Sequence, residues 1–130
     1  ERIWSSAVLL DAWIAHRREA GANEAQKRLI GGLMAELSAL RSLSVAVTGR
    51  LAAGEQPVVE ASLLKDLGTG FEQRVPVVIA DDLGSYPDER IAPGLLTALN
   101  HSLALTPSYS LRGGTREILR GIIARGLGLR

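Results

Sequence analysis

The 130 residues fit one domain, residues 1–130, with a single core. The 15 Lys and Arg residues nearly balance the 14 Asp and Glu residues and are scattered, so the sequence lacks the basic stripe of a nucleic-acid-binding protein. The absence of cysteine excludes disulfides and thiolate metal sites and fits a reducing compartment, so we expect a cytoplasmic protein.

Two predicted helices make up the first half of the chain. Apolar residues recur there at intervals of three and four, which predicts one helix over residues 2–20 and another over 23–54. Gly21 is a stop signal for the first helix, and Asn23 is a good cap for the second. Charges interrupt both apolar patterns, and neither reaches the roughly 20 apolar residues that a membrane span needs. We therefore expect no membrane span.

The second half of the chain contains more helix-breaking residues. A third helix is predicted over residues 57–83, and Pro76 is expected to kink or split it. A short helix is predicted over 93–100, then a loop over 106–114 and a last helix over 115–125. Helices of these lengths joined by short turns predict an all-α fold, an antiparallel up-and-down four-helix bundle.

Most of the remaining polar and aromatic residues favour ordinary structural roles. His16 and His101 lack the spacing that places two ligands on one helix face, so we expect no metal site. His16 is interpreted as a surface residue, and Asp82 as a residue that favours the turn after the third helix. Trp4 and Trp13 are expected to pack at a domain or subunit contact.

A tight turn leads into the last predicted helix. Gly113 and Gly114 permit backbone conformations that other residues avoid, and Thr115 is a favourable N-cap. Glu117 lies in the first turn, where the helix dipole favours a carboxylate. The free N–H groups of a helix start can bind an anion, but the same residues also occur where a helix is only capped.

Three segments resemble acyl-CoA dehydrogenases, in the order in which that family carries them. The ending from Arg112 to Arg130 resembles the family's Gly-Gly-Thr-x-Glu-Ile-x-Arg motif, followed by Ile-Ala-x-Arg and Leu-Gly-Leu. Glu60-Ala-Ser-Leu-Leu-Lys65 looks like the start of a long helix in the family's C-terminal helical domain. The opening Glu1-Arg2 is similar to the start of that domain's first helix. Since the sequence starts without a leader or initiator Met, we expect the C-terminal domain of a longer chain.

The resemblance implies a flavin-dependent reaction on an acyl-CoA thioester. Members of the family remove hydrogens from Cα and Cβ to give a trans-2-enoyl-CoA, with FAD as hydride acceptor. The implied partners are the acyl-CoA substrate, an electron-transfer flavoprotein or similar acceptor, and further subunits in a dimer or tetramer of like or unlike chains.

The resemblance also assigns roles to individual residues. Many relatives carry the catalytic base immediately before a Gly-Thr pair, where this chain has Gly113. A second family location is the Glu before an Arg on the first helix, so Glu1 is the expected base and Arg2 the expected substrate contact. For both residues a solvated surface role is the alternative. The residues expected to approach FAD are Gly113, Gly114, Thr115 and Glu117.

Two further family motifs are imperfect in this chain. Arg-x-x-Phe-Gly, whose Arg contacts the flavin pyrophosphate, is replaced by Arg17-Arg-Glu-Ala-Gly21. Gln-x-x-Gly-Gly-x-Gly, which reaches a neighbouring subunit's FAD, is replaced by Ala80-Asp-Asp-Leu-Gly84. Loss of both would weaken a cofactor site. The first alternative is therefore a non-catalytic subunit of a heteromeric acyl-CoA dehydrogenase, and the second is a helical interaction module without enzymatic activity.

Overall fold

The structure, a computed structural model, describes residues 5–111 and 113–129. Within these ranges the chain forms helices without any strand, which confirms the all-α prediction. The helices are α1 (Ser5–Ala20), α2 (Glu24–Ala52), α3 (Val58–Gly84), α4 (Pro93–Tyr109) and α5 (Arg116–Gly126).

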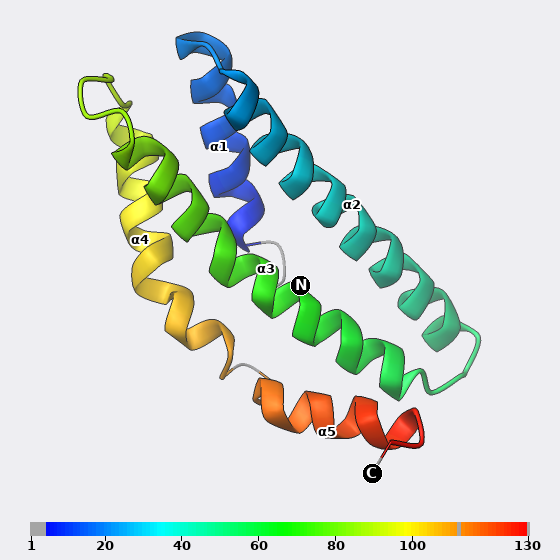
Figure 1. Cartoon of the computed structure of the whole chain (residues 1–130). Coiled ribbons are helices and arrows are strands. Elements are labelled where there is room, and N and C mark those ends of the chain that lie inside the picture. Colours follow the sequence, from blue (N-terminus) through cyan, green and yellow to red (C-terminus); the bar gives the residue numbers. More distant parts are fainter. Residues whose placement is uncertain (1–4, 112, 130) are drawn as a thin grey trace.

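Helix α3 is the hub of the molecule. Figure 1 shows α1, α2, α3 and α4 running alternately up and down, with α5 lying across the lower end of α3. α3 packs against each of the other four helices. Its Phe71, Val75 and Ile79 recur every four residues and are almost completely buried. Burial of each such side chain stabilises the fold by about 1.5–3 kcal/mol.

Helix α2 begins and packs as its sequence pattern predicts. Asn23 caps it, because its side chain accepts a hydrogen bond from the Gln26 N–H while the Gln26 side chain accepts one from the Asn23 N–H. Leu33, Leu40 and Val47 are buried at intervals of seven residues. By length and composition, α2 is the one described helix that could span a membrane. This is weak evidence, because the core helices of soluble proteins pass the same test. The expectation of no span stays a prediction.

Helix α3 continues through Pro76 without splitting. A proline has no N–H, so the carbonyl four residues earlier, that of Glu72, loses its helical donor. The hydroxyl of Ser6 on α1 donates a hydrogen bond of 3.0 Å to this carbonyl oxygen, and Ser6 is fully buried. The partner that α3 cannot supply for itself therefore comes from α1.

The predicted end of the fourth helix is wrong. α4 runs to Tyr109 rather than to residue 100, so residues 106–109 are helical and not part of a loop. Pro107 deprives the Leu103 carbonyl of its helical donor, and the Thr106 hydroxyl donates to that oxygen at 2.8 Å. This side-chain bond explains how the helix passes its own proline.

Helix α5 packs closely against the start of α3. A Cβ atom added at Gly126 would overlap the Val59 side chain, whereas one added at Gly121 would meet nothing within 4 Å. Valine is stiff about χ1 and cannot swing away easily. Gly126 is therefore needed for the close approach of α5 to α3.

We expect Gly126→Ala to reduce the free energy of unfolding by about 1–3 kcal/mol through overpacking. Gly121→Ala in the same helix is the matched control and should leave stability unchanged or raise it by up to about 1 kcal/mol. Urea unfolding followed by circular dichroism measures both. Equal stabilities of the two variants would show that α5 does not pack on Val59.

Candidate functional site

The turn before α5 has the backbone that its glycines predict. Gly113 and Gly114 have φ values of 77° and 101°, which side-chain-bearing residues rarely adopt. Thr115 follows as the N-cap with an extended backbone, φ −71° and ψ 160°, as expected. Its side chain, however, makes no capping hydrogen bond to the helix. The residues predicted to approach FAD thus lie together at one helix start.

The carboxylate of Glu117 bends back toward this helix start. A hydrogen bond from its own backbone N–H, and then one from the Thr115 hydroxyl, hold the pKa of Glu117 below its usual value. Arg120 and Arg116 add attraction to the charged form. The side chain is not buried, so it offers acceptor oxygens to a ligand. Such a carboxylate suits a hydroxyl donor, for example a ribose, better than it suits a phosphate.

An ion cluster fixes the turn to α3. Asp66, only 7% exposed, accepts a 2.7 Å hydrogen bond from Arg116 Nε and lies 3.3 Å from Arg120 Nε. The hydrogen bond from Arg116 holds the pKa of Asp66 below its usual value, and Arg120 lowers it further. Because Arg116 is the first residue of α5, this bond ties the start of the helix to α3.

The place where many relatives of the resembled family carry their base has no side chain here. Gly113 leaves that position empty, and Cε of Lys65 lies 3.9 Å from where its Cβ would be. The Lys65 side chain that approaches this position carries an ammonium group, which favours an anion or a carbonyl oxygen and does not supply a carboxylate base. Glu1 and Arg2, the residues predicted to act on the substrate, lie outside the described residues, as does Trp4.

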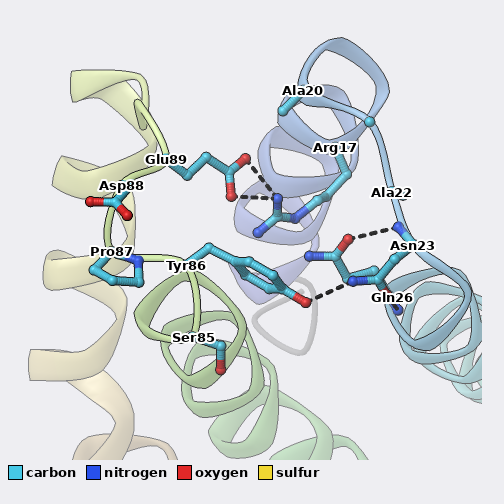
Figure 2. A pocket seen from close by; sticks show the side chains of 11 residues that line it. Arg17, Ala20, Ala22, Asn23, Gln26, Ser85, Tyr86, Pro87, Asp88 and Glu89 are labelled. Atoms are coloured by element: carbon cyan, nitrogen blue, oxygen red, sulfur yellow. Dashed lines mark hydrogen bonds and ion pairs between the residues drawn. The ribbon is translucent and has the colours of Figure 1, made fainter.

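A second polar cluster lies at the opposite end of α3, beside a cavity of about 600 Å³ (Figure 2). The Asp82 carboxylate accepts hydrogen bonds from Trp13 at 2.8 Å, from Arg17 at 2.9 and 2.6 Å, and from Gln26 at 2.9 Å. The carboxylate of Glu89, in the α3–α4 loop, accepts two further bonds from Arg17, each 2.7 Å. Four segments of the chain therefore meet at one buried cluster.

Three interpretations of these residues are wrong. Asp82 lies in the last turn of α3, and its carboxylate does not serve the turn that follows. It is buried among its hydrogen-bond donors. Trp13 is completely buried and lies in the core instead of at a contact surface. His16 is also buried, with Nε2 3.0 Å from the Glu89 carboxylate but not aligned for a hydrogen bond. Trp13 pairs with Asp82 and His16 lies beside Glu89, and each of these partners is about 70 residues away in the sequence.

Arg17 has no charge to spare for a ligand. It stands where the resembled family places its pyrophosphate contact, yet Asp82 and Glu89 already outnumber it two to one. Asp88 adds a further carboxylate at the cavity wall. A diphosphate would have to displace buried carboxylates, so this cavity does not fit that part of FAD.

The described residues include no group of three or more His, Cys, Asp or Glu side chains that could hold a metal ion. Comparison of the chain with protein-family models, curated proteins and solved structures found no match. The resemblance to acyl-CoA dehydrogenases therefore stays a prediction from the motifs.

The lowered pKa of Asp66 predicts how stability depends on pH. A carboxyl whose folded pKa lies below its unfolded pKa stabilises the fold above the unfolded value, about 3.9, and this contribution is lost as pH falls toward the folded pKa. We expect Asp66→Asn to cost about 1–3 kcal/mol at pH 7. Urea unfolding at several pH values measures the free energy of unfolding of both chains. The difference between the variant and the wild-type chain should become smaller below about pH 4. A gap that is constant across this range would exclude the Asp66 ion pairs as its source.

Proposed function

We propose that this chain is the C-terminal helical domain of an FAD-dependent acyl-CoA dehydrogenase. In this proposal α1 to α4 are the up-and-down four-helix bundle of that domain, and the turn before α5 faces FAD. The observation that carries the proposal is that two of the motifs behind the resemblance meet in space. Lys65 ends one motif and lies over Gly113 in the other, and Asp66 binds Arg116.

The groups around the turn fit a dinucleotide. The Glu117 carboxylate suits a ribose hydroxyl, and the N–H groups at the start of α5 other than that of Glu117, with the Lys65 side chain nearby, favour negative charge. When bound, FAD would supply the hydride acceptor for α,β-dehydrogenation of the acyl-CoA to a trans-2-enoyl-CoA. Glu1 is the proposed base and Arg2 the proposed substrate contact. An electron-transfer flavoprotein would accept the electrons. The dehydrogenase itself would be a cytoplasmic dimer or tetramer.

A non-catalytic subunit of a heteromeric acyl-CoA dehydrogenase is the second candidate. Two observations favour it: Gly113 has no carboxylate, and Arg17 is held by Asp82 and Glu89. In such an assembly this chain would complete another subunit's site or stabilise the complex without turning over substrate itself.

Flavin binding by the full-length protein tests the site. We expect Glu117→Gln to weaken FAD binding about tenfold, since a hydrogen bond to a charged acceptor is worth about 1.5 kcal/mol. Glu24→Gln is the matched control, because Glu24 is also a first-turn carboxylate open to solvent, on α2, and should leave binding unchanged. Titration of the apoprotein with FAD measures both. Equal affinities of the two variants would remove Glu117 from the site.

Bleaching of the bound flavin by an acyl-CoA separates the two candidates. An active dehydrogenase should lose its yellow colour with substrate, and Glu1→Gln should slow bleaching by at least about 100-fold while flavin stays bound. Unchanged turnover in this variant would remove Glu1 from the mechanism. A protein that binds FAD only together with a second subunit would instead favour the non-catalytic role.

A further inference from the structure

The C-terminal end of α5 lies beside the turn that joins α2 to α3 (Figure 1). Two contacts link these segments. Arg50 in the last turn of α2 pairs with Glu60 in the first turn of α3, and Gly126 at the end of α5 lies against the Val59 side chain. Residues 50–60 and 125–129 therefore form one tip of the molecule, the α5 tip.

Four large apolar side chains of the α5 tip are more than half exposed. The exposed fraction is 56% for Leu51 and 53% for Val58, and it is 63% for Leu127 and 61% for Leu129. Single apolar residues are common on protein surfaces and need no explanation. Four of them at one tip indicate a surface that contacts another molecule or a membrane.

Positive charge is concentrated at the same end of the chain. The basic residues are spread along the whole sequence, but the acidic residues are nearly absent from its last twenty positions. Residues 111–130 contain five arginines and one acid, Glu117, which gives a net charge of +4, whereas residues 1–110 have a net charge of −3. Such an asymmetry indicates an anionic partner.

Arg125 brings this charge to the α5 tip. Its side chain is exposed and donates a hydrogen bond of 3.2 Å to the Gly121 carbonyl oxygen of its own helix. It makes no ion pair with any residue between 5 and 111 or between 113 and 129, the part of the chain that the structure describes. The guanidinium is therefore available to an anion outside the molecule.

A surface that is both apolar and positively charged matches an anionic lipid bilayer. Lipid phosphates lie at the bilayer surface and hydrocarbon begins a few Å below it, so arginine and leucine side chains find their partners at the same time. Leucines that project from a tip can enter this boundary without a partner of complementary shape.

We propose that the α5 tip binds the surface of anionic membranes. Leu51, Val58, Leu127 and Leu129 enter the boundary between headgroups and acyl chains, and Arg125 contacts lipid phosphates. This is attachment to a membrane surface, with no helix spanning the bilayer. The turn proposed to face FAD lies at the other end of α5, so the assignment does not rest on the proposed enzymatic function.

Flotation of the full-length protein with lipid vesicles tests the proposal and needs no flavin. The protein should bind vesicles made of equal parts of phosphatidylcholine and phosphatidylserine. Its affinity should fall at least about tenfold on vesicles of phosphatidylcholine alone, because the attraction to anionic lipid is lost. Raising the salt concentration from about 0.1 M to about 1 M should also weaken binding, since the screening length falls from about 10 Å to about 3 Å.

Two variants of the tip and two matched controls locate the contact. Leu127→Asn should weaken binding to the mixed vesicles about tenfold through lost apolar burial, and Arg125→Gln about fivefold through a lost phosphate contact. Val8→Asn on α1 and Arg28→Gln on α2 make the same kinds of change at exposed positions outside the tip. Both controls should bind as the wild-type protein does, and circular dichroism verifies that all four variants are folded.

Three results would overturn the proposal. The first is a wild-type protein that does not bind the mixed vesicles, and the second is equal binding by Leu127→Asn and Val8→Asn. The third is tighter binding to a DNA duplex than to vesicles, unchanged by Leu127→Asn, which would assign the positive charge to nucleic acid. None of these results affects FAD binding by Glu117, so the two proposals fail separately.

Discussion

The buried ion pair between Arg17 and Asp82 sets the relative placement of the helices at one end of the molecule. Each charge would cost several kcal/mol in the interior if its hydrogen bonds were not made. Asp82 on α3 needs Trp13 and Arg17 from α1 and Gln26 from α2 at the same time. A rearrangement that separates α3 from α1 or α2 would leave the Asp82 carboxylate without some of these donors, so the cluster restricts how the three helices pack.

The same cluster limits what this end of the molecule binds. Glu89 completes the coordination of Arg17 and draws the α3–α4 loop over α1. A guanidinium that could otherwise meet a phosphate is thereby used as an internal tie. At the other end of α3, Arg116 and Asp66 tie down α5 in a similar way but leave Glu117 open to solvent. The two ends of α3 thus use similar ion pairs with different results. At one end the charged groups bind only one another, and at the other end a carboxylate stays open to solvent.

Features that depend on neighbouring residues were predictable from the sequence. The Asn23 cap and the left-handed Gly113-Gly114 turn arise from local chemistry, and the structure contains both. The continuation of α4 past Pro107 was not predicted, because a single Thr106 hydroxyl offsets the helix-breaking residue. The Asp82 cluster was not predicted, because no pattern in the neighbouring sequence indicates hydrogen-bond donors that come from α1 and α2. The catalytic roles of Glu1 and Arg2 rest on the motifs alone.

The hydrogen bond from Ser6 to the Glu72 carbonyl makes α3 depend on a distant part of its own chain. If alanine replaced Ser6, the Glu72 carbonyl oxygen would lose this donor while α1 still covers it, at a cost of about 1–3 kcal/mol. Ser6 and Pro76 are energetically coupled, because a chain in which another residue replaces Pro76 regains the backbone N–H donor and no longer needs the Ser6 hydroxyl at this carbonyl.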